Sequence, residues 1–204
     1  VPAGFGAVTA LAGADDHVCA LDEAGAVACW GTDRDGATAI PDELHGIVEI
    51  VVGNAHSCAL DAAGLVTCWG YGLDGRTAVP AEAGPFAQIA AGAEFTCALG
   101  LTGAVVCAGR SDQGQTMVPE GLDPMVAIAA GSAHACALDA AGEVTCWGSD
   151  LSGQASVPAG LGAAVAIAAG ERHTCALDAA GALTCWGNDE WGQVSVPSAL
   201  GTVV

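Results

Sequence analysis

Short apolar segments alternate with Gly, Pro and Asp along the chain, and no segment keeps a helical period of apolar residues. Near the C-terminus these segments are "VAIAAG" (165–170), "HTCALD" (173–178), "ALTCWG" (182–187) and "QVSVP" (193–197). Segments of this length between turn-forming residues are typical of β-strands. The alanine-rich runs do not predict helices, because a glycine or proline soon follows and the apolar stripe ends within about two turns. The pattern therefore predicts four strands, which we name A, B, C and D.

The four-segment pattern occurs five times, with 39 residues between equivalent positions. Two cysteines ten residues apart and one proline keep this spacing in every unit, as Cys175, Cys185 and Pro197 do in the last. A fixed period of this size indicates a repeat architecture. We therefore expect a single domain, 1–204, made of the units 1–46, 47–85, 86–124, 125–163 and 164–204, with Pro2 and residues 196–204 in phase with them.

The turn between strands B and C predicts how the cysteines pair. The sequence Asp-Ala-Ala-Gly at 178–181 suits a type I turn followed by a glycine in the left-handed region. Counting outward from this turn places Cys175 directly opposite Cys185. Opposed Cα atoms in a pair without mutual backbone hydrogen bonds are about 4.5 Å apart, a distance that a disulfide accepts.

We therefore expect one cross-strand disulfide in each unit. The expected pairs are Cys19–Cys29, Cys58–Cys68, Cys97–Cys107, Cys136–Cys146 and Cys175–Cys185. Disulfides persist in oxidising compartments, so the protein is expected to be secreted, periplasmic or exposed at the cell surface.

A metal site is the competing interpretation of the cysteines. His173 shares a strand face with Cys175, and Cys185 lies opposite, which would suit a Cys₂His site. In the third unit, however, Phe95 stands at the histidine position while both cysteines remain. Because the cysteines keep their spacing without the histidine, the sequence favours disulfides and predicts no metal.

A four-stranded antiparallel sheet of this size cannot bury both of its faces by itself. Strand B places His, Cys and Leu on one side and Thr, Ala and Asp on the other, so neighbouring units must cover both faces. Radial stacking of such sheets forms a β-propeller. We expect an all-β fold, a β-propeller of five four-stranded antiparallel blades with one intra-blade disulfide per blade.

The fifth unit also resembles a known repeat. "GERHTCAL" and "CWGNDEWGQ" are similar to the repeat of the regulator of chromosome condensation family, G-x-x-H-x-x-A-L, a glycine turn, and W-G-x-N-x-x-G-Q. The matching residues are Gly170, His173, Ala176, Leu177, Gly181, Trp186, Gly187, Gly192 and Gln193, and Asp189 stands where the family often has Asn. The resemblance covers essentially the whole chain and points to a bacterial, secreted variant with paired cysteines. It implies a propeller, commonly of seven blades.

Repeated histidines and tryptophans are expected to be structural. The residues at these two phases are His17, His56, His134 and His173, and Trp30, Trp69, Trp147 and Trp186. The histidines are expected to hydrogen-bond a neighbouring backbone, and the tryptophans to fill the space between blades. The third unit changes both together, to Phe95 and Ala108, as a coupled packing set would.

The composition restricts the class of partner. Four basic and 23 acidic residues give a formal charge of −19. Binding to nucleic acid or to an anionic membrane needs clustered Lys or Arg, so neither is expected. No apolar run reaches the 18 or so residues that span a bilayer, and the chain does not open with a charged and then apolar leader. We expect a mature or excised domain without membrane insertion, whose acidic surface provides solubility or attracts a basic partner or divalent cations.

Loop variation predicts where a partner binds. In a propeller the A–B turns and C–D loops share one rim, and here the C–D loops differ, as "TDRDG", "YGLDG", "RSDQG", "SDLSG" and "NDEWG". Loops that need not repeat can diverge toward a ligand, and exposed Trp, Tyr and Arg are common anchors of interfaces. The candidate partner-binding residues are Arg34, Asp35, Tyr71, Leu73, Asp74, Arg110, Asp112, Leu151, Arg172, Glu190 and Trp191.

Catalytic motifs are missing from the sequence. It contains no G-x-S-x-G elbow, no isolated His–acid pair and no glycine-rich phosphate loop, so we expect neither enzyme activity nor a cofactor. The expected function is binding to a protein of unknown identity. The alternatives are a self-assembling structural array or a part of a larger propeller, a secreted enzyme inhibitor, and a carbohydrate-binding propeller.

Overall fold

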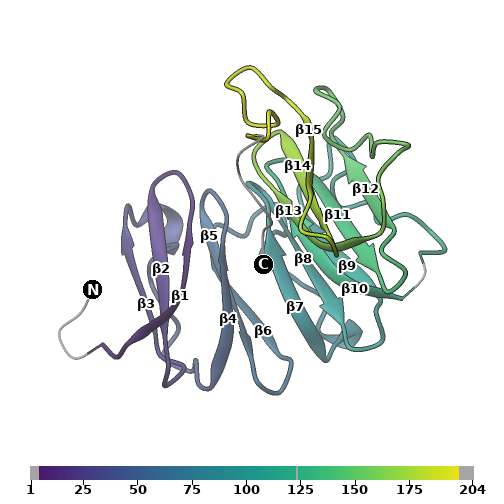
Figure 1. Ribbon diagram of the computed structural model, residues 1–204. Coiled ribbons are helices and arrows are strands. Elements are labelled where there is room, and N and C mark those ends of the chain that lie inside the picture. The colour runs from purple at the N-terminus through teal and green to yellow at the C-terminus, as the bar shows by residue number, and fades with distance from the viewer. Residues whose placement is uncertain (1–4, 123, 198–204) are drawn as a thin grey trace.

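The computed structural model describes residues 5–122 and 124–197 (Figure 1). Five antiparallel sheets of three strands follow one another along the chain. The strands are β1 (Val8–Gly13), β2 (His17–Asp22) and β3 (Val27–Gly31); β4 (Ile47–Val52), β5 (His56–Asp61) and β6 (Val66–Gly70); β7 (Phe86–Ala91), β8 (Phe95–Gly100) and β9 (Val105–Gly109); β10 (Met125–Ala130), β11 (His134–Asp139) and β12 (Val144–Gly148); and β13 (Ala164–Ala169), β14 (His173–Asp178) and β15 (Leu183–Gly187). Two short 3-10 turns, η1 (Arg34–Gly36) and η2 (Ala81–Ala83), complete the elements.

The three strands of each sheet are the expected strands A, B and C. The turn between β14 and β15 has the predicted form: Gly181 has φ of +80°, and the amide of Asp178 donates to the carbonyl of Ala182 at 3.0 Å. This turn places Cys175 opposite Cys185, as counted from the sequence. All five cross-strand disulfides form between the expected partners, with Cα–Cα distances of 4.0–4.1 Å. The predicted pairing is therefore confirmed.

The fourth strand expected in each unit is not formed in the described residues. We call the five segments expected as strand D, residues 37–41, 76–80, 115–119, 154–158 and 193–197, the D segments; they consist of turns and unpaired extended chain. The carbonyl that opens a D segment is bonded to side chains of the following sheet. The carbonyl of Gln154 accepts from Trp186 Nε1 at 3.0 Å and from Thr174 Oγ1 at 2.9 Å. Each D segment also ends in a proline, which has no N–H for a ladder.

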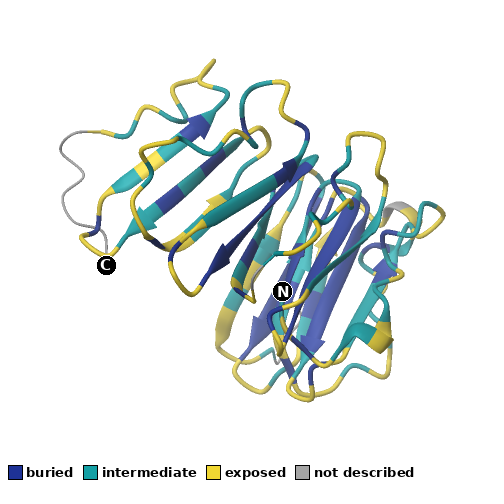
Figure 2. Ribbon diagram, turned by 90° about the vertical axis from the view of Figure 1, so that its right-hand side faces the viewer, coloured by how far each residue is buried: buried dark blue, intermediate teal, exposed yellow. Residues whose placement is uncertain are grey.

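The sheets pack consecutively, so each hydrophobic core is shared by two neighbours. Strands β1, β4, β7, β10 and β13 lie beside one another in this order, and Figure 1 shows the sheets in a curved row. Between the first and second sheets the core includes Leu21, Ile47, Ile50 and Trp69. Figure 2 shows that buried positions run along the strands and exposed ones along the loops. Neighbouring units cover the faces of the three internal sheets as expected, and the chain is a β-propeller repeat protein.

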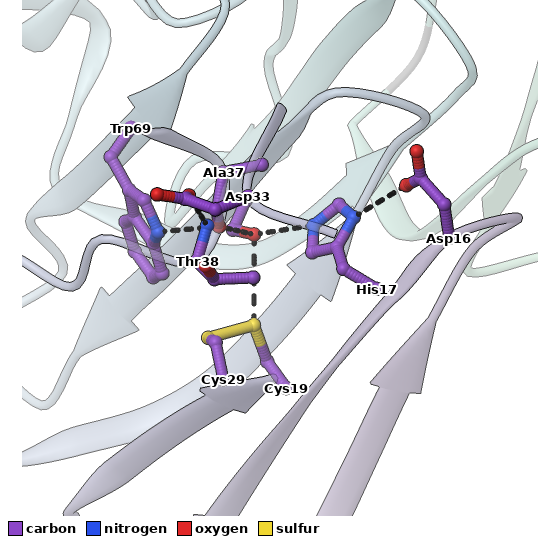
Figure 3. Close-up of a disulfide and its surroundings, with 9 residues drawn as sticks. Asp16, His17, Cys19, Cys29, Asp33, Ala37, Thr38 and Trp69 are labelled. Carbon is purple, nitrogen blue, oxygen red and sulfur yellow. Dashed lines mark hydrogen bonds and ion pairs between the residues drawn. A yellow bond between two sulfur atoms is a disulfide. The ribbon is translucent and has the colours of Figure 1, made fainter. Parts of the chain in front are cut away.

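A hydrogen-bonded side-chain junction links the first sheet to the second. His17 Nε2 lies 2.9 Å from Ser57 Oγ in the second sheet, and this hydroxyl donates to the carbonyl of Ala37 at 2.9 Å. Trp69 Nε1 donates to the same carbonyl at 2.9 Å (Figure 3). Trp69, Trp147 and Trp186 thus fill the space between sheets as expected, whereas Trp30 of the first sheet is exposed. The histidine, in contrast, contacts a hydroxyl and not the backbone, because the Ser or Thr stands between the ring and the carbonyl.

Both ends of the chain include residues that the structure does not describe. Residues 1–4, which include Pro2, and residues 198–204 of the in-phase overlap lie outside the described residues, as does Asp123. In the described part, no helix is long and apolar enough to cross a membrane.

Candidate binding rim

The A–B turns and C–D loops meet on one rim of the molecule. The amide of Tyr71, which follows β6, donates to the carbonyl of Ala55 in the A–B turn at 2.8 Å. Gly70 makes this approach possible: its φ is +99°, and a Cβ there would lie 2.6 Å from that carbonyl oxygen. Equivalent bonds join the two loops in the other four sheets. Loops that vary in sequence are therefore fixed to the repeated framework.

The A–B turns also bond to one another along the row of sheets. The amide of Asn54 donates to the carbonyl of Ala93, Ala93 to Ser132, and Ser132 to Glu171, at 3.0–3.1 Å. These turns line a central cavity of about 350 Å³. Residues from all five units contribute to its lining, including Asp15 from the first. The inner border of the rim is consequently rigid and built mainly from backbone.

A charged hollow of about 310 Å³ lies on the rim around the second and third sheets. Its lining includes Asp35, Tyr71, Asp74, Arg76, Glu94 and Arg110. Arg76 is only 4% exposed, and its Nε donates to Asp74 Oδ1 at 2.8 Å. The guanidinium carbon lies 4.9 Å from the centre of the Tyr71 ring, within the range of a cation–π contact. Tyr71 is thereby held in place by a cation that is itself fixed.

Ion pairs extend this hollow toward the third sheet. Glu94 contacts both arginines, with Oε1 at 3.5 Å from Arg76 Nη2 and Oε2 bonded to Arg110 Nη1. Arg110 Nε also lies 2.9 Å from Asp112 Oδ1. The hydrogen bond from the Arg76 side chain holds the pKa of the Asp74 carboxyl below its usual value. Asp74 is therefore ionised at neutral pH, and the hollow places carboxylates beside two guanidinium groups.

The other predicted rim residues lie in two further hollows or project into solvent. Arg172, Glu190 and Trp191 line a hollow on the fifth sheet, and Leu151 lines another beside Arg172. Leu73 and Leu151 are each 89% exposed and Trp191 is 83% exposed. The side chain of Arg34 lies outside the part of the chain that the structure describes.

Sequence reasoning missed Arg76 and Glu94, although both shape the charged hollow. Arg76 occupies the phase at which the third, fourth and fifth units have glutamine. A charged residue at a framework position is a signal that could have identified it. Glu94 lies in an A–B turn, and only the folded geometry brings it to both arginines.

The cysteines are not available as metal ligands, because all ten form disulfides. Within residues 5–122 and 124–197, no group of three or more His, Cys, Asp or Glu side chains is placed to hold a metal ion. What the rim offers is a rigid surface with apolar projections and paired charges, which suits recognition of another macromolecule.

Comparison with known proteins places the repeat in a family. The model of the regulator of chromosome condensation (RCC1) repeat matches residues 47–76, 86–115, 125–154 and 164–193. No significant sequence match was found among curated proteins.

Several solved structures are similar to the chain. The ectodomain of the Physcomitrella patens receptor kinase CR4 is 30% identical with a TM-score of 0.74, over 88% of this chain and 51% of that one. The CRINKLY WD40 ectodomain of the Arabidopsis thaliana receptor kinase ACR4 is 27% identical with a TM-score of 0.70, over 89% and 66%. Prp20p from Saccharomyces cerevisiae is 22% identical with a TM-score of 0.77, over 94% and 59%, and shares the fold. The chain thus spans about half to two thirds of these proteins.

Proposed function

The chain belongs to the regulator of chromosome condensation (RCC1) repeat family, and we propose that it is an extracellular module that binds a protein partner. The partner contacts the rim of A–B turns and C–D loops. The observation that carries the proposal is the trio of exposed apolar side chains, Leu73, Leu151 and Trp191, on loops that otherwise follow a rigid repeat. In this proposal the five units act together as one domain, 1–204.

Two observations support a location outside the cytosol. Every cysteine of the chain is in a disulfide, and such bonds persist in oxidising surroundings. The two plant relatives are ectodomains of receptor kinases. We propose that the protein is secreted, periplasmic or displayed at a cell surface. A bacterial origin stays a prediction from the sequence.

The rim favours binding over catalysis. Its apolar side chains would each contribute roughly 1.5–3 kcal/mol if a partner buried them fully. The loops that carry them are bonded to the A–B turns, so little conformational entropy is lost on binding. The formal charge of −19 disfavours nucleic acid and anionic lipid, and we propose a protein as the partner and a binding role without enzyme activity.

Affinity capture from the native extracellular medium tests the rim. The test variant combines Leu73→Ala, Leu151→Ala and Trp191→Ala. The matched control combines Leu65→Ala and Leu101→Ala, which remove exposed leucines at the B–C turns of the opposite rim. We expect the control to retain the same partner as the wild type and the rim variant to lose it. Equal capture by all three proteins, or loss only with the control, would contradict the assignment.

A further inference from the structure

One hollow on the rim contains buried polar groups that the described chain leaves without partners. It lies between the C–D loop of the fourth sheet and the A–B turn of the fifth, and its volume is about 160 Å³. Gln154 and Ser149 line it and are only 3% and 6% exposed. Within the described residues, neither Gln154 Nε2 nor Ser149 Oγ forms a hydrogen bond. Buried polar groups are normally bonded, so this pair needs an explanation.

The orientation of the Gln154 carboxamide is determined by its own loop. The amide of Ser152 donates to Gln154 Oε1 at 2.8 Å, so Nε2 is the group that remains without a partner. The main-chain carbonyl of Gln154 is engaged separately, by Thr174 and Trp186 of the fifth sheet. Because an amide NH₂ group donates and does not accept, a group that binds Nε2 must present an acceptor.

The equivalent donors of the second, third and fifth units are each paired with an oxygen of their own C–D loop. The donor is a side-chain nitrogen of the first residue of the D segment. The pairs are Arg76 with Asp74, Gln115 with Asp112, and Gln193 with Asn188, with the donor and acceptor atoms 2.8, 3.5 and 2.6 Å apart. A donor at this position is therefore normally bonded within its repeat.

The fourth unit lacks all three of these acceptors. Its C–D loop carries different residues at their positions, namely Ser152 for Asp74, Leu151 for Asp112 and Ser149 for Asn188. Leucine has no polar side-chain atom, and neither serine hydroxyl is bonded to Gln154. Asp150 is no substitute, because both of its carboxylate oxygens are bonded within the loop. Among the described residues Gln154 Nε2 has no acceptor, so the acceptor has to come from another molecule.

Charge and size determine which acceptor the hollow suits. Its two charged residues form an ion pair, with Arg172 Nε 3.3 Å from Glu171 Oε1, and the rest of its lining is uncharged. A carboxylate would lie beside Glu171 in a chain of formal charge −19, so a neutral oxygen is favoured. The serine hydroxyls accept as well as donate, and therefore suit a group that also carries N–H. A primary carboxamide has both, and the shortest of the internal pairs already uses one, that of Asn188.

We propose that this hollow binds the side-chain carboxamide of an Asn or Gln residue of the protein partner. The oxygen of that group accepts from Gln154 Nε2, and its NH₂ donates to Ser149 Oγ. The inference rests on the proposed function, because the hollow is part of the same rim and Leu151, whose exposed side chain belongs to the proposed interface, lines it. A partner without this group would leave a buried donor unpaired, so the contact provides specificity.

Small probes test the hollow without the partner. Propionamide represents the carboxamide side chain, N-methylacetamide a peptide group, and propionate a carboxylate. In NMR spectra of the intact chain we expect propionamide to shift the side-chain amide signals of Gln154 saturably, with an affinity about fivefold or more above that of the other two probes. A preference for N-methylacetamide would identify a peptide carbonyl as the ligand, and a preference for propionate an acidic side chain. Either preference, or no saturable shift with any probe, would overturn the proposal.

The substitution Ser149→Asn supplies the missing acceptor from within the chain. It copies Asn188 of the fifth unit, and the position accepts larger side chains, because it holds Tyr71 in the second unit and Arg110 in the third. We expect this variant to keep its melting temperature and to lose the response to propionamide. The matched control Ser111→Asn changes an exposed serine of the same rim and should keep the response.

A second variant protects the test against misfolding. Leu151→Asp copies Asp112 of the third unit at a position that is 89% exposed, and it should also abolish the response. Unchanged binding of propionamide by both folded variants would contradict the role of Gln154 as the donor.

Capture experiments distinguish this inference from the proposed function. If the wild type and Ser149→Asn retain the same partner equally, while the rim variant loses it, the rim is correct and the carboxamide contact is wrong. If the rim variant captures as well as the wild type but propionamide binds, the proposed function is wrong and the hollow is a carboxamide site for another ligand. Weaker capture by Ser149→Asn than by Ser111→Asn is the result expected from both proposals together.

Discussion

The junction between the second and third sheets allows a quantitative test of what holds the repeats together. Thr96 is fully buried; its hydroxyl accepts from His56 Nε2 at 2.9 Å and donates to the carbonyl of Arg76 at 2.8 Å. The substitution Thr96→Val keeps the shape of the side chain and removes only the hydroxyl. It leaves one buried N–H and one buried carbonyl unpaired, because Ala108 stands where Trp69 of the second sheet donates its indole N–H to the equivalent carbonyl.

The expected cost of Thr96→Val is about 1–5 kcal/mol in the free energy of unfolding, from two unpaired buried groups at about 1–3 kcal/mol each, reduced by about 1 kcal/mol gained in apolar burial. A change of tautomer gives no relief, because His56 Nδ1 is buried without a hydrogen-bond partner. Equilibrium unfolding in urea measures the loss. The matched control is Thr184→Val, the same exchange at an exposed position of β15, which should cost within about 0.5 kcal/mol.

A second variant separates the hydrogen bond from general disruption. The double substitution His56→Phe with Thr96→Ala copies the Phe95–Ala135 junction and should be clearly less destabilising than the sum of its two single changes. If Thr96→Val costs no more than Thr184→Val, or if the double substitution is simply additive, the proposed role of the hydroxyl is wrong.

Three further results are expected from the same structure. Burial lowers the pKa of His56 to about 4, and that of the equivalent histidine in the fourth sheet to about 4, so both are neutral in the folded state. The free energy of unfolding should therefore have its maximum value above about pH 6.5. It should fall by about 3 kcal/mol per histidine as the pH decreases from 6.5 to 4, and urea titrations at several pH values measure this loss. Replacing Cys58 and Cys68 together by alanine should lower stability by about 2–3 kcal/mol for a closed loop of this length, and Ellman titration should find no thiol in the native wild type. The substitution Gly92→Ala should prevent normal packing, since its Cβ would overlap the Phe95 ring, and an unchanged melting temperature would contradict this.

The sequence was sufficient to predict what depends on local geometry. The turn at 178–181 determines the register of its hairpin, and the register determines the disulfide, so counting residues placed Cys175 opposite Cys185. The strand ends were predicted to within about one residue for the same reason. Coverage of both sheet faces by neighbours also followed, because neither side of strand B is strongly polar.

Features that depend on contacts between units were harder to predict. The fourth strand was predicted from its short apolar pattern, but the carbonyl of Gln154 is engaged by the next sheet, and this is invisible in a single unit. The hydroxyl opposite each histidine lies 40 residues away in the chain, just outside one repeat. The charged hollow was found only in part, because Arg76 and Glu94 lie on different loops and are brought together by packing.

The D segments have a consequence for how such a protein could be rearranged during evolution. Their contribution to the next sheet is a main-chain oxygen, which alanine, arginine and glutamine provide equally well at 37, 76 and 154. Duplicating, deleting or transposing whole repeats leaves that bond intact whichever copies become adjacent. The histidine and its hydroxyl are different, because their match is encoded in two separate copies. Exchanging the second repeat with the fifth would still place a hydroxyl opposite each internal histidine and Ala135 opposite Phe95. Placing the fourth repeat directly after a copy that carries histidine would instead put Ala135 opposite that histidine.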